Sequence, residues 1–419
     1  MEATTCDGVA ELATLVTNSK FLYDTIVRVV FDGAALTIQW MPSEGSRIGG
    51  ESSDAEGLFN RNLLVGSLDG LLKVCEATVP GPAYDEYYCS TDPLRVVKAV
   101  TVNCEINRAR YMPRKPNIVA VKCQTPEVVV VNLDSAPSCL ESEQLIVEEL
   151  GSANSVKLNG HSDEGFGLSW NQTHAGYLLS GANDGTVCVW DVSKAMESES
   201  ARTPIHKWNR CTTPVNDVTW NMKDASVFAY VADDGRLILE DIRVSGEKSL
   251  ATVKAHDGQK VLSVAFNPQN AYILLTGSSK GDIKVWDTRK LQEEVHWIEC
   301  EEEKEIFRLE WCPAKESVFA AGDTGADITL YDLSKIGDEI DDVTTEYGGA
   351  EKIFTHKFHV SEISDISWDE EIPWLIASVC EGWVCTLWKI TGDIYKDDDS
   401  DVSISDSELN SMLEMSSEE

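Results

Sequence analysis

Residues 167–191, GLSWNQTHAGYLLSGANDGTVCVWD, contain one complete unit of the pattern that decides the fold. Apolar and polar residues alternate in Gly167–Trp170, Tyr177–Gly181 and Thr186–Asp191, which is the period of half-buried β-strands. Turn-forming residues separate these segments, and the second turn is Asn183-Asp184-Gly185. Asp-Gly turns between alternating segments are typical of β-hairpins. The unit therefore predicts three short antiparallel strands.

The same unit returns along the chain at unequal intervals. In each copy an aromatic residue closes the first alternating segment. A later alternating segment ends 20 residues after that aromatic, as Trp190 follows Trp170. A constant inner spacing within a variable period indicates a repeated core with variable loops. The aromatic positions, which we call the anchors, are Tyr111, Trp170, Trp220, Phe266, Trp311 and Trp368, and the positions at the constant distance after them are Val131, Trp190, Glu240, Trp286, Tyr331 and Trp388.

Histidines precede three of the anchors by nine or ten positions, at His161, His256 and His359. Together with the glycine turns, this pattern resembles the WD-repeat β-propeller, in which four strands form a blade. A seventh unit runs from Leu36–Trp40 to Leu63–Cys75, so the sequence predicts an all-β, seven-bladed propeller. The last blade needs an outer strand, and we predict that Tyr23–Phe31 supplies it, because ring closure removes exposed edges. We expect the longer polar connections at residues 78–97, 133–156, 192–203 and 333–352 to lie between blades.

The two ends of the chain differ from the repeats. Residues 8–19 have apolar side chains at helical spacing, which predicts a short N-terminal helix. Residues 397–419 contain nine Asp and Glu and no Lys or Arg, which is the composition of a disordered acidic tail. We therefore divide the chain into an N-terminal helix segment (1–21), a seven-bladed propeller (22–392) and an acidic tail (393–419).

The charge balance restricts the partners. The chain has 35 Lys and Arg against 71 Asp and Glu, a formal net charge of −36. The tail from residue 397 contributes −9, so residues 1–396 still carry −27, and the acidity is a property of the propeller body. A surface of this sign repels phosphate backbones, which excludes direct nucleic-acid binding as a main activity. The same field attracts cationic partners.

Targeting signals, cysteine spacing and apolar runs point to one kind of compartment. The N-terminus lacks the basic and apolar regions of a secretory signal, and no apolar stretch is long enough to cross a membrane. The 12 cysteines include no C-x-x-C pair. We expect reduced, half-buried core cysteines in a cytosolic or nuclear protein.

Motifs for catalysis are missing with one formal exception. The chain contains no nucleotide-binding or zinc-protease motif, while Gly277–Gly281 matches G-x-S-x-G around Ser279. That motif requires a strand-to-helix turn, whereas here it falls between two predicted strands. His356 and His359 lack further clustered ligands. We expect no enzymatic activity, no cofactor, no metal and no small-molecule substrate.

Longer stretches resemble one family more closely than the repeat alone does. Asn107–Pro113 (NRARYMP) and Asp332–Gly337 (DLSKIG) are the most specific of them, and Phe21–Asp24, Leu36–Trp40 and Ile363–Trp368 add to the match. Over about residues 18–400 the chain resembles the retinoblastoma-binding histone-chaperone family, which includes the small subunit of chromatin assembly factor 1. The resemblance implies a nuclear, non-catalytic histone-binding scaffold subunit of chromatin assembly, remodelling, deacetylase or methyltransferase complexes, with a cytoplasmic pool left open.

The resemblance implies a first site on the flat face around the central channel, for the tail of histone three or similar basic peptides. Carboxylates there would accept charge-assisted hydrogen bonds from Arg and Lys, and Phe307 would cover an aliphatic stem or an Arg plane. The chain departs from the family at Phe166 (usually Tyr), Asn216 (usually Glu) and Leu262 (usually Asn), so affinity or peptide choice would differ. The implied residues are Glu105, Asn107, Arg108, Glu164, Phe166, Glu305, Phe307 and Glu381.

A second implied site is a side groove between the N-terminal helix and the acidic loop 338–351, which would take the first helix of histone four. The N-terminal helix is shorter than is usual in the family, and Gly348-Gly349 stands where the family has two prolines. These glycines add backbone freedom that binding must remove. The implied groove residues are Leu15, Phe21, Leu22, Asp341, Asp342, Glu346 and Ile394.

Two other hypotheses stay open at this point. One is a divergent acidic WD-repeat scaffold that recruits other basic peptides, for example in ribosome assembly. The other is a hydrolase that uses Ser279. The leading hypothesis has histones three and four and other chromatin-complex subunits as its partners, without nucleic acid or membrane.

Overall fold

The 167–191 unit folds as its pattern predicts. In the computed structural model, β12 (Leu168–Trp170), β13 (Tyr177–Gly181) and β14 (Thr186–Asp191) form consecutive antiparallel pairs, and β15 (His206–Asn209) adds the outer strand. Trp190 lies opposite Leu178 and is fully buried. The structure describes residues 19–42, 57–82, 84, 86–91, 94–136, 139, 148–149, 154–244, 249–299, 304–338 and 349–395.

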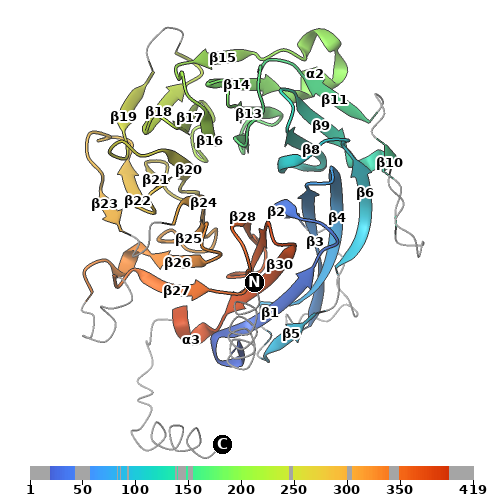
Figure 1. The fold of residues 1–419 in the computed structure, drawn as a ribbon, viewed down its shortest axis with the longest axis vertical. Coiled ribbons are helices and arrows are strands. Elements are labelled where there is room, and N and C mark those ends of the chain that lie inside the picture. Colours follow the sequence, from blue (N-terminus) through green and yellow to red (C-terminus); the bar gives the residue numbers. More distant parts are fainter. Residues whose placement is uncertain are drawn as a thin grey trace, which may run out of the picture.

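Seven such sheets surround a central channel, which confirms the predicted seven-bladed propeller (Figure 1). We number the blades in chain order from the seventh sequence unit, so that β12–β15 form blade 3. Blade 1 contains β2 (Ala35–Trp40), β3 (Leu58–Ser67), β4 (Leu71–Pro80), β6 (Arg95–Thr101) and β10 (Glu148–Glu149), and blade 2 contains β7 (Ile106–Met112), β8 (Lys115–Cys123), β9 (Val128–Asn132) and β11 (Ser155–Leu158).

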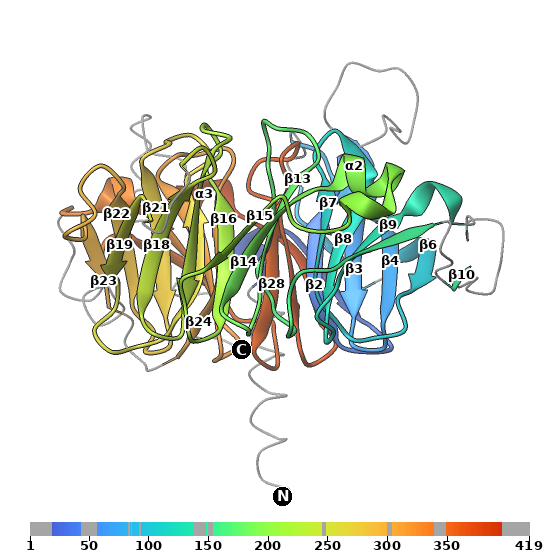
Figure 2. The same ribbon diagram turned by 90° about the horizontal axis from the view of Figure 1, so that it is seen from above.

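The remaining blades continue around the ring, and the strands of each run through the thickness of the disc (Figure 2). Blade 4 contains β16 (Val215–Trp220), β17 (Val227–Ala232), β18 (Arg236–Asp241) and β19 (Ala251–Lys254), and blade 5 contains β20 (Val261–Phe266), β21 (Ile273–Ser278), β22 (Ile283–Asp287) and β23 (His296–Ile298). Blade 6 contains β24 (Ile306–Trp311), β25 (Val318–Asp323), β26 (Ile328–Asp332) and β27 (Lys352–His356). Blade 7 contains β28 (Ile363–Trp368), β29 (Ile376–Cys380), β30 (Val384–Ile390), β1 (Tyr23–Val30) and β5 (Tyr88–Ser90).

The hydrophobic core lies between the blades rather than within them. Seven clusters of buried side chains are found among the described residues, and each cluster joins one blade to the next. A blade is a thin sheet that cannot bury both of its faces alone, so each blade depends on two neighbours.

Buried histidines connect the loops before the first strands to the blades through hydrogen bonds. In blade 3, His161 Nε2 lies 2.7 Å from Ser180 Oγ, which also accepts a 2.8 Å hydrogen bond from Trp190 Nε1. His256 and His359 occupy the equivalent places in blades 5 and 7. These contacts explain why the histidines recur at a nearly fixed distance before the anchors.

The N-terminal strand closes the ring as predicted. The strand β1 pairs antiparallel with β30, so the start of the chain supplies an outer strand to the last blade. Tyr23 is 3% exposed, its Oη lies 2.9 Å from His356 Nδ1, and its ring makes edge contacts with Phe354, Phe358 and Trp388. The observed strand ends at Val30, just before the predicted limit at Phe31.

The prediction that the four long connections lie between blades is wrong, because each joins the third strand of a blade to the fourth strand of the same sheet. Several of them also contain regular structure that the sequence pattern does not reveal. The strand β5 pairs parallel with β1, and β10 pairs parallel with β6. Helix α2 (Val192–Glu197) begins at the N-cap Asp191, whose side chain accepts from the amide of Lys194. Short 3-10 helices follow β9, α2 and β26, at Leu133–Ser135, Glu199–Ala201 and Leu333–Lys335. These elements are short and depend on backbone pairing or caps, so they leave little periodicity.

The predicted chain ends fall largely outside the described residues. Residues 19–22 are helical, whereas residues 1–18 and 396–419, with most of the predicted helix and tail, are outside. Helix α3 (Gly392–Tyr395) follows β30, and its Ile394 and Tyr395 pack against the core between blades 6 and 7. No helix in the described part of the chain is long and apolar enough to span a membrane.

The cysteines and the G-x-S-x-G segment have structural roles. Ten cysteines fall within the described residues as thiols, and eight of them are buried. Ser279 lies in the turn between β21 and β22, where its amide donates to Lys260 O at 3.0 Å. The strand-to-helix turn of a hydrolase nucleophile is therefore not formed there.

Candidate peptide-binding face

The first strand of almost every blade carries a β-bulge at the same place. The pairing register shifts around residues 36, 107, 216, 262, 307 and 364, each of which lies four positions before an aromatic that closes a first strand. A bulged residue is unpaired and its side chain is re-aimed, which is a device often found beside functional sites. We call the residues at this position the bulge ring: Leu36, Asn107, Phe166, Asn216, Leu262, Phe307 and Ser364, where Phe166 is placed by its spacing from Trp170.

The bulge ring contains both the site residues that the resemblance implies and the positions at which this chain departs from the family. It contains the implied site residues Asn107, Phe166 and Phe307 and the altered positions Asn216 and Leu262. Sequence reasoning missed Leu36 and Ser364, although their constant spacing before the closing aromatic would have found them.

Two aromatic residues of the bulge ring meet across the channel. The rings of Phe166 in blade 3 and Phe307 in blade 6 lie 6.0 Å apart at 83°, which is an edge-to-face contact. The two blades are three positions apart around the propeller, so this contact bridges the channel. Phe307 is only half-buried, which leaves apolar surface at the centre of this face.

The predicted carboxylates lie in the loops and turns around the bulge ring. Glu164 accepts from Asn107 Nδ2 at 3.3 Å, so these two residues lie together. Glu105 accepts from the side-chain amide of Gln124. Glu305 and Glu381 are exposed, and their loops are fixed by backbone bonds to Thr324 and Glu362. All four lie just before a first strand or in the turn between the second and third strands, which places them on one face of the propeller.

Arg108 points away from this face into a buried ion network. It is 3% exposed, and its NH1 lies 3.7 Å from Asp217 Oδ1. Burial lowers the pKa of Arg108 to about 10, and nearby Arg308 contributes to the shift. Arg108 therefore supports the channel from within rather than offering a charge to a ligand.

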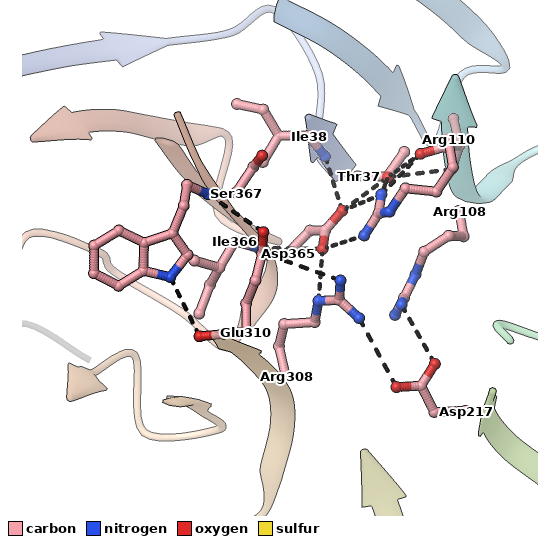
Figure 3. Close-up of polar contacts among 12 residues, drawn as sticks. Thr37, Ile38, Arg108, Arg110, Asp217, Arg308, Glu310, Asp365, Ile366 and Ser367 are labelled. Atoms are coloured by element: carbon pink, nitrogen blue, oxygen red, sulfur yellow. Dashed lines mark hydrogen bonds and ion pairs between the residues drawn. The ribbon is translucent and has the colours of Figure 1, made fainter. Parts of the chain in front are cut away.

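The network joins four blades below the bulge ring (Figure 3). Asp365 is fully buried and receives both guanidinium NH groups of Arg110 at 2.8 Å. Arg308 Nε lies 3.1 Å from the same carboxylate, and Arg308 NH1 lies 3.8 Å from Asp217. Burial opposes ionisation of Asp365, but the arginines outweigh it and hold its pKa well below the usual range. These ion pairs therefore join the inner strands of blades 2, 4, 6 and 7.

A cavity of about 420 Å3 opens from the channel where the first strands end. Tryptophans and prolines from several blades line it, including Trp170, Trp311 and Pro268, and Glu310 adds a carboxylate. Burial raises the pKa of Glu310 to about 7, although Arg308 and Arg110 favour its charged form. Among the described residues, no group of three or more His, Cys, Asp or Glu is arranged to hold a metal ion.

The raised pKa of Glu310 makes stability depend on pH. The unfolded state loses this proton near pH 4.5 and the folded state near pH 7, so stability falls as pH rises between these values. We expect the protein to lose about 2–3 kcal/mol relative to Glu310→Gln between pH 5 and pH 8. Urea unfolding at both pH values would measure the difference, with the exposed Glu316→Gln as control. Parallel pH curves for Glu310→Gln and the unsubstituted protein would contradict the assignment.

Comparisons with known proteins agree with the repeat architecture. The model of the WD domain, G-beta repeat, matches residues 154–191 and 247–287. The chain is also 30% identical over 397 residues to WD-40 repeat-containing protein MSI3 of Arabidopsis thaliana, which covers 91% of this chain and 89% of that protein. The chain belongs to the MSI family of WD-repeat proteins. This is the retinoblastoma-binding family that the sequence resembles.

The two matched segments are MSI-family repeats that retain the signature residues. Each contains a histidine and ends in Trp-Asp, at His161 with Trp190-Asp191 and at His256 with Trp286-Asp287. Blade 4 instead has Glu240 at the tryptophan position, and Arg210 Nε donates to its carboxylate at 2.9 Å. The strand pairing is retained in that blade, so the fold of this MSI-family scaffold tolerates loss of the signature.

The implied side groove of the MSI-family chain is only partly described. Phe21 is 68% exposed, whereas Leu22 and Ile394 are half-buried and pack against the core between blades 6 and 7. The other implied groove residues, Leu15, Asp341, Asp342 and Glu346, lie outside the described residues, as does Gly348.

Proposed function

We propose that this MSI-family protein is a non-catalytic, histone-binding scaffold subunit of nuclear chromatin complexes, with a cytoplasmic pool left open. The observation that carries the proposal is the grouping of Glu105, Glu164, Glu305 and Glu381 on the face that also presents the Phe166–Phe307 pair. The assembly, remodelling, deacetylase and methyltransferase machineries of chromatin are the complexes it would serve.

The face suits an extended basic peptide such as the N-terminal tail of histone three. Arg and Lys side chains of the peptide would donate charge-assisted hydrogen bonds to the carboxylates. The aromatic pair of Phe166 and Phe307 would cover an aliphatic stem or a guanidinium plane. The net charge of −36 would speed the encounter with a cationic partner.

The side groove is proposed as a second contact, with the first helix of histone four. The exposed ring of Phe21 supports this proposal, because a helix with an apolar face would remove it from water. Leu15, Leu22, Asp341, Asp342, Glu346 and Ile394 complete the proposed groove.

Charge reversal on the face should abolish most of the binding. We expect Glu105→Lys with Glu164→Lys to weaken binding of a fluorescein-labelled histone-three tail peptide by roughly tenfold or more, because two attractive carboxylates become repulsive. Fluorescence anisotropy at two salt concentrations would measure the effect, and binding by the unsubstituted protein should weaken as salt rises.

A matched control carries the same charge change elsewhere. Glu197 at the end of α2 and Glu293 after β22 are both exposed, so Glu197→Lys with Glu293→Lys alters net charge without touching the face. Equal losses in the two double variants would show a non-specific charge effect and overturn the assignment of the face.

A second candidate function is recruitment of basic peptides other than histones. It is favoured by Asn216, which stands where the family usually has a carboxylate. The Asn216 amide donates to Asp233 Oδ1 at 2.9 Å and to Val261 O at 2.7 Å. Phe166 and Leu262 also change the bulge ring. This function would be favoured if purified histones three and four fail to bind the protein while a basic ribosomal-protein peptide binds it.

A further inference from the structure

Trp383 occupies a turn position that five other blades fill with glycine or alanine. It lies between β29 and β30 with φ +68°, in the left-handed region. The equivalent turn positions carry Gly70, Gly185, Gly235 and Gly281, with φ between +75° and +100°, and Ala326 in blade 6. A bulky residue is strained in this conformation, whereas glycine adopts it freely. The fold alone therefore favours glycine at this position.

The fold buries only part of the Trp383 side chain. The Trp383 side chain is 53% exposed. The backbone carbonyl of Trp383 accepts from Phe31 N at 2.8 Å, but any residue supplies that acceptor. Residues held in such strained conformations are concentrated at functional sites.

Two further exposed apolar side chains adjoin the same turn. Val30 ends β1, is 59% exposed and belongs to the strand that pairs with β30 through Val384. Val360 is 60% exposed, and a Cβ on Gly382 would lie 2.6 Å from its Cγ2 atom. Exposed apolar groups that gather in this way, with a tryptophan among them, are typical of interaction surfaces.

Carboxylates frame these apolar groups. Glu381 is exposed two positions before Trp383, and its amide donates to the carbonyl of Glu362, which is also exposed. The complementary ligand is an apolar side chain with Lys or Arg close by in an extended chain. Glu381 also belongs to the candidate peptide-binding face, so one peptide could contact both.

We propose that Trp383, Val30 and Val360 form a docking patch for an apolar side chain of the basic peptide that binds the channel face. The patch, which rests on the proposed function, would select among basic peptides by an apolar residue. The peptide would leave the channel face over blade 7.

The test separates a binding role from a structural one, because the two predict opposite effects on stability. Trp383→Gly should leave the thermal unfolding midpoint level or raise it, since glycine relieves the left-handed strain. Trp383→Asn retains a side chain that tolerates this conformation and removes only the indole. A marked fall in the unfolding midpoint of both variants would assign Trp383 to the fold and overturn the proposal.

Binding is measured with a leucine scan of the fluorescein-labelled histone-three tail peptide, in which each non-basic residue is replaced in turn. On the unsubstituted protein we expect leucine at one or two positions to tighten binding by about fivefold or more, and both Trp383 variants should lose this gain. Trp297→Ala, which removes another half-exposed tryptophan, should retain it.

The outcomes distinguish this inference from the proposed function. Binding of the parent peptide without any Trp383-dependent gain would overturn the docking patch and leave the proposed function standing. Failure of the unsubstituted protein to bind any peptide of the series would overturn both. A gain that Trp297→Ala also abolishes would show non-specific apolar adhesion and reject the patch.

Discussion

Replacing Asp365 by asparagine is expected to lower the free energy of unfolding by about 3–5 kcal/mol, because it removes one partner of a buried ion network. The Asp365 carboxylate receives both NH groups of Arg110, and Arg308 Nε lies 3.1 Å away. It also accepts from Thr37 Oγ1 at 2.9 Å. Asparagine would leave two buried guanidinium groups without their shared counter-charge and would turn an NH2 group toward donors. Urea unfolding followed by tryptophan fluorescence would measure the loss.

The control is the same substitution at an exposed ion pair. Asp287 accepts from Arg289 Nε at 2.9 Å, but the Arg289 side chain is 60% exposed. Exposed pairs contribute little, so Asp287→Asn should cost no more than about 1 kcal/mol. A small loss in both variants would show that water screens the channel network. Because the pKa of Asp365 is lowered, its contribution is present above about pH 4 and is lost as pH falls through the folded-state value.

Tyr23→Ala is expected to destabilise the ring closure by about 3–5 kcal/mol, since it removes a large buried side chain. Tyr23 contacts aromatic residues of blades 6 and 7, including Phe354 and Trp388. It is also the first residue of β1, so the cavity would form where the two ends of the propeller meet. Thermal unfolding and limited proteolysis near the N-terminus would detect the weakened closure.

Two further substitutions identify the origin of this loss. Tyr23→Phe removes only the hydroxyl that lies 2.9 Å from His356 Nδ1, so we expect a loss of about 1–2 kcal/mol. Tyr87 is 40% exposed, and Tyr87→Ala should have a smaller effect than Tyr23→Ala. If Tyr23→Ala were no worse than Tyr23→Phe, the aromatic cluster would not hold the closure.

The fold could be predicted because each blade repeats a local pattern. Alternation, the constant spacing after each anchor and the recurring turns indicated the blades, and the need to pair an edge indicated the role of residues 23–31. The strands β5 and β10 could not be predicted, because they are very short and pair through their backbones. The cap at Asp191 that starts α2 also left no periodic signal.

The chemistry of the candidate site stays a prediction from the sequence, and the burial of its individual residues could not be predicted. The family resemblance assigned carboxylates and Phe307 to one face. Nothing in the local sequence distinguishes Asn107, whose amide bonds to Glu164 of the face, from its neighbour Arg108, which points into the buried ion network. A β-bulge makes that difference, and the contacts across the channel join residues from opposite sides of the ring. Such contacts depend on the closed geometry of all seven blades.

The pairing of β1 with β30 also has a consequence for the order of events during synthesis. Val30 is synthesised about 350 residues before its partner Val384. At roughly 5–20 residues per second, the first strand waits about 20–70 s for the strand that will cover its edge. Throughout that interval the nascent chain carries an unpaired apolar strand, which is a site for erroneous association. The ring can therefore close only after every blade has been synthesised, and translation interrupted before β30 would release a chain in which β1 has no partner.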